Sequence, residues 1–462
     1  MNSNNTKSLP LSRKIAFAVG QVGWSLAVVG FTDLILIFYL PPDNGQPMFK
    51  AFVNQNLIYK VFTIIGVLTA VGYIISAFME PIVGSLSDRS TFKFGKRKTF
   101  MAFSVVPFAI LSAVVFFPLK DGLHSINAVW LSFTVIAAFI VKCFYTTPYN
   151  AMINEIATDE KERLHIIMLL SIAYALGIGI GQTIHIFLGV FKGQLPNEQI
   201  FQYSILAYAV IAFICMLFPI LFVEDNSGKE ISKEELLYDK KHSGIFDNML
   251  EVWNDKNYRV LLWVELIYWF PQKIFVVAVP YIVTALLKLD NIYTAIILYS
   301  VGIASLVMYP LIDKLVDKYG KKKIMQSALL CLVLSFSFTA TMGLYKLPTI
   351  FFIVVYILIN TYPTAVLGIL PMALAGDNAQ HDFEKTSVAK NASYYALKTF
   401  MMKIGVAITS LVSASLLMLG KTPQNPFGVR MVAIVCVVSA VLSLIVIRKY
   451  KDVVLEDRRD VI

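Results

Sequence analysis

The sequence predicts an all-α membrane protein with twelve transmembrane helices arranged as two related six-helix halves. Of its 462 residues, 57% are hydrophobic and only 15% are charged, which is more apolar surface than a water-soluble fold can bury. The apolar residues gather in successive runs of about 20, the length at which a helix crosses a bilayer. Two loop motifs also recur about half a chain apart.

The expected elements follow from these runs. The spans are predicted near residues 14–40, 58–86, 99–118, 128–153, 164–191, 200–224, 258–286, 291–313, 324–344, 348–375, 391–418 and 427–447. Such runs favour helices over β-barrel strands, which are about 10 residues long and alternate in polarity. The predicted domains are an N-terminal six-helix bundle (1–224), a central cytoplasmic linker (225–256) and a C-terminal six-helix bundle (257–462).

Basic residues predict the orientation of the chain. Lys and Arg concentrate in the linker and in alternate loops, as expected of cytoplasmic segments. We therefore predict a multi-pass protein of the cell (cytoplasmic) membrane with both termini in the cytoplasm and no cleaved leader. This bias also accounts for the formal net charge of +10, so we expect no nucleic-acid partner. The expected partners are the lipid bilayer and a small-molecule substrate, and we expect a monomer.

The sequence contains no motif typical of an enzyme, a metal site or an ATP-driven pump. The four cysteines fall in separate predicted spans, where we expect them to pack as small apolar residues. No Gly-x-x-x-x-Gly-Lys-Ser/Thr loop occurs, and no cluster combines a nucleophile with a base. We therefore predict a protein that is not an enzyme and needs no cofactor or metal.

An internal repeat is the most informative feature. Residues 81–88 run from a proline to an aspartate and lead to Gly95-Lys96-Arg97-Lys98. Residues 310–317 have the same spacing from proline to aspartate and lead to Gly320-Lys321-Lys322-Lys323. Each copy connects the second and third predicted spans of its half. A duplicated six-span unit of this kind is typical of secondary transporters.

These motifs resemble the major facilitator superfamily, in the form found in sucrose transporters and in glycoside-pentoside-hexuronide:cation symporters. The resemblance rests on Asp88-Arg89 with residues 94–98, on residues 148–155 and their echo at 371–377, and on Gly23-Trp24-Ser25-Leu26. It implies the major facilitator fold of two pseudo-symmetric six-helix bundles, and transport by alternating access.

The charged loops of the repeat suggest a conformational latch. Asp88 and Arg89 in the first half, and Asp317 and Lys318 in the second, are placed to form inter-helix ion pairs on the cytoplasmic face. The alternative is that these charges only enforce topology.

Several ionisable residues fall at membrane depth. They are Asp33, Glu80, Lys142, Glu265, Lys273, Lys398 and Lys403. A charge at the bilayer centre costs about 2.5 to 3.5 kcal/mol, so such a group usually faces a cavity or a partner. The resemblance implies that Asp33, Lys142, Glu265 and Lys273 face a central cavity. The alternative is that lysine–carboxylate pairs hold the bundles together.

A position-by-position comparison with the melibiose permease, a sodium-coupled sugar symporter of this family, separates retained groups from lost ones. Glu80 matches a cation-site carboxylate, and Thr399 and Lys403 match groups near the cation and sugar sites. The other matched positions of those sites hold Ser25, Ser76, Thr146, Asn150, Ser171 and Gly368 in this chain. The galactoside site is therefore not reproduced.

The coupling ion predicted from these differences is a proton. Na⁺ needs several oxygen ligands, and the lost carboxylates leave few of them beside Lys142, which lies one helical turn from Thr146. We therefore favour proton coupling or uniport over sodium coupling. Glu80 and Lys403 are the predicted cation-coupling residues, with Glu80 as the titrating group.

The predicted function is secondary active transport of a sugar, glycoside or sugar acid, with cation (proton) coupling. The candidate substrate-binding residues are Trp24, Asp33, Lys142, Tyr145, Thr146, Trp269, Lys273 and Thr399. Aromatic rings among them are suited to stack on a sugar, whereas Lys142, Lys273 and Lys403 favour an anionic substrate such as a hexuronide. Two alternatives stay open: a lysolipid or drug-type exporter on the same fold, and an uncoupled uniporter of an anionic solute.

Overall fold

The computed structural model describes residues 10–42, 48–55, 61–88, 90, 92, 94–157, 160–224, 245–386 and 390–453. Within these ranges, twelve helical segments are long and apolar enough to cross a membrane, which confirms the predicted fold class. The chain divides into two compact units: Met1–Tyr39, Phe49–Gln55 and Phe78–Lys240 form the first, and Leu40–Met48, Asn56–Ala77 and Lys241–Ile462 form the second. The helix α3 (Ile64–Asp88) contributes residues to both.

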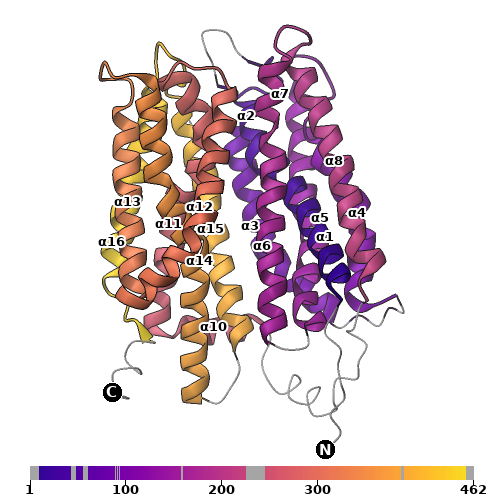
Figure 1. Ribbon diagram of the computed structural model, residues 1–462. Coiled ribbons are helices and arrows are strands. Elements are labelled where there is room, and N and C mark those ends of the chain that lie inside the picture. The colour runs from indigo at the N-terminus through magenta and orange to yellow at the C-terminus, as the bar shows by residue number, and fades with distance from the viewer. Residues whose placement is uncertain are drawn as a thin grey trace, which may run out of the picture. The chain divides into compact units, whose positions relative to one another are not determined.

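The first unit is built around α1. Its other elements are the π-helical segment Gly30–Leu34, α2 (Ile35–Tyr39), α4 (Lys96–Val114), α5 (Ser125–Ile156), α6 (Glu160–Gln182), α7 (Ile184–Val190) and α8 (Asn197–Phe222). The helix α1 (Leu11–Val29) packs against α6 and α8, and α4 packs against α5 and α8 (Figure 1). An aromatic cluster lies in the core of this unit. The ring centroid of Phe38 lies 5.0 Å from that of Phe201 and 5.5 Å from that of Phe116.

The second unit repeats this packing. Its elements are α10 (Ile245–Trp253), α11 (Lys256–Tyr281), the π-helical segment Ile282–Leu286, α12 (Ile292–Tyr319), α13 (Lys321–Thr341), α14 (Thr349–Thr386), α15 (Asn391–Leu417) and α16 (Phe427–Ile447). The helix α11 packs against α15 and α16, and α13 packs against α14 and α16. Since α1 and α4 have the corresponding partners in the first unit, the packing follows the repeat seen in the sequence.

The repeat extends to the backbone at two glycines. Gly95 directly precedes α4 with φ 110° and ψ 144°, and Gly320 directly precedes α13 with φ 83° and ψ 152°. This region of backbone space is essentially restricted to glycine, because a Cβ atom would clash there. The glycine at the start of each basic cluster therefore sets the sharp entry into the third span of its half.

Several helix boundaries differ from the sequence prediction, and two of the differences bear on the sites described below. The tenth span is predicted to end at residue 375, but α14 continues to Thr386 and has 38 residues, or about 57 Å at 1.5 Å per residue. A hydrocarbon core is about 30 Å thick, so apolarity marks only the part of this helix that lies in lipid. In addition, α10 is helical inside the predicted linker (225–256).

Candidate functional site

A buried carboxylate in the second unit has the most unusual surroundings. Glu265 on α11 is 1% exposed, and its Oε1 lies 2.9 Å from the Nζ of Lys398 on α15. The same oxygen accepts hydrogen bonds from Trp269 Nε1 at 2.8 Å and from the Tyr268 hydroxyl at 3.2 Å. These donors follow Glu265 by four and three residues, so they share its face of the helix.

The second oxygen of the Glu265 carboxylate, Oε2, is buried and is not hydrogen-bonded by any described residue. A buried acceptor without a partner costs about 1–3 kcal/mol, and more when it is charged. A proton or a donor group on a ligand would remove that cost. The Glu265–Lys398 pair is therefore suited to exchange partners, whereas a fully bonded pair would only hold two helices together.

Close helix packing brings the pair together. A Cβ atom at Gly405 of α15 would lie 2.4 Å from the carbonyl oxygen of Leu266 on α11 and 3.3 Å from the Cβ of Trp269. Only glycine permits this approach. It brings the backbone of α15 against the turn of α11 that presents Trp269, which is half-buried and adjacent to the pair.

A second polar contact lies on α15 near this pair. Lys403 is 4% exposed, and its Nζ donates to the Oγ of Ser76 on α3 at 3.0 Å and to the Ser76 carbonyl oxygen at 3.2 Å. Thr399 and Lys273, also predicted to bind substrate, are half-buried on α15 and α11. Lys403 thus places a positive charge on the serine that matches a lost cation-site carboxylate.

In the first unit, the predicted residues occupy distinct surroundings. Asp33 is 7% exposed in the π-helical segment, and its Oδ1 accepts a hydrogen bond from the Thr32 hydroxyl at 3.0 Å. Single π-helical turns are frequent at functional sites. Trp24 is half-buried, and its Nε1 donates to Gln21 at 3.0 Å. Glu80, the predicted titrating group, is half-buried on α3.

Lys142 on α5 is a buried lysine without an ion pair among the described residues. It is 8% exposed, and its Nζ lies 6.0 Å from the centroid of the Phe139 ring. Thr146, one turn later, donates its hydroxyl to the Lys142 carbonyl oxygen at 3.0 Å. The Tyr145 hydroxyl donates to the Met216 carbonyl oxygen at 2.8 Å, so this side chain links α5 to α8.

Matching ion pairs accompany the repeated loops. Arg97 Nε lies 2.8 Å from Glu155 Oε1, and Lys321 Nζ lies 2.6 Å from Asp377 Oδ2. Each pair joins the start of the third span of its half to the far end of the fourth.

The predicted latch residues are only partly described. Arg89 and the Asp88 side chain lie outside the described residues. Asp317 and Lys318 are exposed, and Lys318 Nζ lies 5.1 Å from the ring centroid of Tyr319. The latch therefore stays a prediction.

The sequence identified both members of the Glu265–Lys398 pair as charges at membrane depth, but it did not pair them. Spacing along one helix excludes a direct contact between Glu265 and Lys273, which are eight residues apart. It does not show which lysine of another helix reaches the carboxylate. Neither Glu265 nor Lys398 is therefore among the predicted substrate-binding or cation-coupling residues. The opposite charges of two buried residues were the available signal.

Comparison with known proteins identifies related chains. The sequence profile of a family described as MFS/sugar transport protein matches residues 16–448. An uncharacterized symporter, YnaJ of Bacillus subtilis, is 22% identical over 484 aligned positions that cover 100% of this chain and 97% of YnaJ. A putative glycoside/cation symporter, YagG of Escherichia coli, is 30% identical over 100 residues, which cover 22% of each chain. The isoprimeverose transporter of Lactiplantibacillus pentosus is 21% identical over 206 residues, 45% of this chain and 42% of that protein.

Solved structures show the same fold at low sequence identity. A D-xylose–proton symporter has a TM-score of 0.69 and 13% identity, with 96% of this chain and 98% of that chain covered. The nucleoside transporter NupG has a TM-score of 0.62 and 13% identity, with 96% of this chain and 99% of that chain covered. At these identities the comparison establishes the arrangement of helices.

Proposed function

The chain belongs to the MFS/sugar transport protein family, in its glycoside-pentoside-hexuronide branch, and we propose that it is a proton-coupled transporter of a glycoside or sugar acid. The observation that supports this proposal is the buried Glu265 carboxylate, which has one oxygen on Lys398 and one without a hydrogen bond from a described residue. In alternating access, the two six-helix bundles would move against each other around the bound substrate.

Coupling follows from partner exchange at this pair. Addition of a proton to Glu265 Oε2 cancels the carboxylate charge and leaves the Lys398 ammonium without its counter-ion. An anionic group on the substrate then replaces the carboxylate as the partner of Lys398, whose side chain is 12% exposed. When the substrate leaves, the unpaired ammonium favours loss of the proton and return of the pair. Proton and substrate are therefore expected to cross together.

The aromatic and hydroxyl groups nearby fit a sugar. Trp269 donates to Glu265, is half-buried, and has an aromatic ring of the kind on which sugars stack. Thr399 and Lys273 add a hydroxyl and a second cation. Further substrate contacts are proposed in the first unit, at Trp24, Asp33, Lys142 and Thr146. Relatives described as glycoside/cation symporter and isoprimeverose transporter support a sugar substrate and a coupling cation.

Sodium is the less favourable coupling ion. Lys403 directs an ammonium at Ser76, so the group that replaces a cation-site carboxylate already has a positive partner. A hard cation prefers several oxygen ligands, and repulsion by Lys403 would weaken its binding there. Glu80 stays a second candidate for the titrating group. We also propose that the protein is a monomer of the cell membrane, with both termini in the cytoplasm.

Uptake by the purified protein in liposomes tests this function. Neutral glycosides, hexuronides and lysolipids are offered in turn, under an imposed pH gradient or an imposed Na⁺ gradient at constant membrane potential. We expect concentrative uptake of a sugar-type solute with the pH gradient alone. Uptake driven only by Na⁺ would exclude proton coupling, and transport of lysolipid without any sugar would support the exporter alternative.

A further inference from the structure

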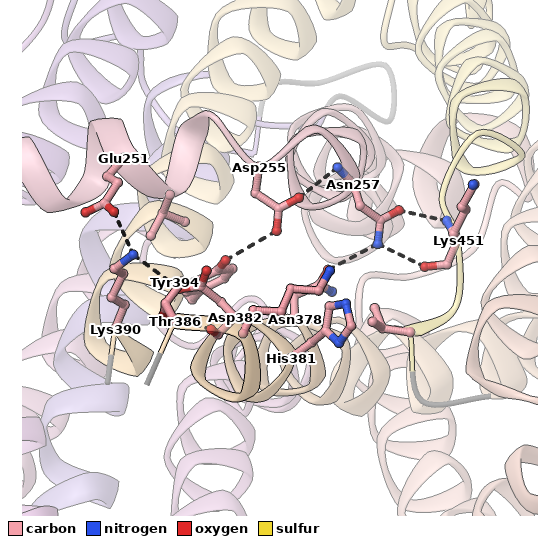
Figure 2. A pocket seen from close by; sticks show the side chains of 13 residues that line it. Glu251, Asp255, Asn257, Asn378, His381, Asp382, Thr386, Lys390, Tyr394 and Lys451 are labelled. Atoms are coloured by element: carbon pink, nitrogen blue, oxygen red, sulfur yellow. Dashed lines mark hydrogen bonds and ion pairs between the residues drawn. The ribbon is translucent and has the colours of Figure 1, made fainter. Parts of the chain in front are cut away.

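A polar pocket lies in the second unit, and its lining includes neither Glu265 nor Lys398. It has a volume of about 440 Å³, within the size range of small-molecule sites. Its walls come from α10, the start of α11, the end of α14, the start of α15 and the segment after α16 (Figure 2). Because the 38 residues of α14 exceed the length that a bilayer needs, we infer that its polar last turns, and with them this pocket, lie outside the hydrocarbon.

The carboxylates around this pocket are mostly engaged. Asp255 Oδ1 accepts from the backbone N–H of Asn257 at 2.8 Å and of Tyr258 at 3.1 Å, and so caps α11. Its Oδ2 accepts from the Tyr394 hydroxyl at 3.3 Å. Glu251 lies 2.7 Å from the Nζ of Lys390. These groups hold the walls together and leave little capacity for a ligand.

Lys390 is held in its charged form by its surroundings. Burial lowers its pKa, but the hydrogen bond to Glu251 and the charge of Asp382, 3.5 Å away, outweigh this, and the pKa is raised. Asn257 also lines the pocket. Its side chain hydrogen-bonds to the Asn378 side chain and to the backbone N–H and C=O of Lys451. Figure 2 shows the contacts of these residues along the pocket wall, from Glu251 to Lys451.

The groups that remain available are mainly cationic. Lys385 and Lys451 line the pocket, are exposed, and have no ion-pair partner among the described residues. His381 is half-buried and has no hydrogen bond with the part of the chain that the structure describes. Deeper in the pocket, Asp382 Oδ2 is buried; it lies 3.5 Å from Lys390 Nζ as an ion pair and accepts no hydrogen bond from a described residue. The available groups thus combine cations at the rim with an acceptor inside.

We propose that this pocket binds a small anion that carries hydroxyl groups, of the sugar-phosphate class. The anionic group would lie between Lys385 and Lys451 with His381 as a further donor, and a hydroxyl would donate to Asp382 Oδ2. Such a ligand joins α10, α14 and α15. Because α15 also carries Lys398, occupancy would restrain a helix that the proposed transport cycle has to move. The site would then regulate transport by a soluble metabolite, a role that rests on the proposed function.

Binding to the purified full-length protein tests this site without measuring transport. Calorimetric titration at constant ionic strength compares glucose 6-phosphate with inorganic phosphate and with glucose. The test variant is Lys385→Gln/Lys451→Gln, and both positions are exposed, so folding should be unaffected. Lys346→Gln is the matched control, because Lys346 is an exposed lysine just before the other end of α14. Lys142→Gln checks that the probe does not report the proposed transport site.

We expect saturable binding of glucose 6-phosphate that weakens at least about tenfold in the double variant and is unchanged in the two other variants. Inorganic phosphate should bind more weakly because it lacks the sugar hydroxyls, and glucose should not bind. The proposal is overturned if no saturable binding occurs up to about 10 mM, if glucose or phosphate binds equally well, or if the double variant binds like the wild type. Loss of binding in Lys142→Gln alone would place the ligand at the transport site instead.

Discussion

Glu265 and Lys398 form a buried ion pair that uses only one of the two carboxylate oxygens. The 2.9 Å contact joins α11 to α15, and the second oxygen lies buried without a donor among the described residues. An indole donor and a phenol donor from the same helix hold the first oxygen in place. The pair is thus fixed in position but incompletely satisfied, and this combination suits a group that gains and loses a proton.

Removal of one member of the pair should destabilise the fold more than removal of both. Glu265→Gln leaves the Lys398 ammonium without its counter-ion, and Lys398→Gln leaves the Glu265 carboxylate without its counter-ion. An uncompensated buried charge typically costs about 3–5 kcal/mol. The double substitution leaves no charge and should recover part of the loss. Thermal unfolding of the single variants and the double variant measures this coupling. Additive losses would show that the two side chains do not depend on each other.

Lys142→Gln should make the protein more stable and less active. The wild-type ammonium is buried without an ion pair among the described residues, and an unpaired charge at this depth is costly. A neutral amide relieves that cost, so the thermal midpoint should rise while uptake of an anionic substrate falls. Measurement of both quantities on one preparation is decisive. A lower midpoint with unchanged uptake would assign Lys142 a purely structural role.

Gly95→Ala and Gly320→Ala should each lower the free energy of unfolding by about 1–3 kcal/mol. Both glycines have positive φ, at 110° and 83°, in a region that strains any residue with a Cβ. Gly302→Ala serves as control, because it lies inside α12 and the added Cβ would meet no atom within 4 Å beyond its chain neighbours and the local backbone of that helix. Alanine there should be neutral or stabilising. Equal effects at all three positions would contradict the backbone argument.

The ion pairs of the repeated loops should contribute to stability in both units. Glu155→Gln removes the partner of Arg97, and Asp377→Asn removes the partner of Lys321. Each pair is partly buried, so we expect losses of about 1–3 kcal/mol in unfolding measurements. Asp313→Asn, at an exposed carboxylate of α12 without a partner among the described residues, should change stability little. If Glu155→Gln and Asp377→Asn lowered the free energy of unfolding no more than this control does, the ion pairs would not contribute to stability.

The fold could be predicted because its signals are local. Long apolar runs and the repeat of residues 81–88 at 310–317 need no tertiary information, and the twelve spans are confirmed. The length of α14 could not be predicted from apolarity, because its last turns lie outside lipid. The site was only partly predictable. Membrane depth identified Glu265 and Lys398 as unusual, but their pairing depends on how α11 and α15 face each other.

Proton-driven accumulation by Glu265→Gln in liposomes tests the central claim most directly. The amide cannot release a proton, so the variant should lose concentrative uptake under a pH gradient but keep exchange of labelled for unlabelled substrate across the same membrane. Asp313→Asn should retain both activities, as the wild type does. Full proton-driven accumulation by Glu265→Gln would contradict the assignment of this carboxylate as the coupling group.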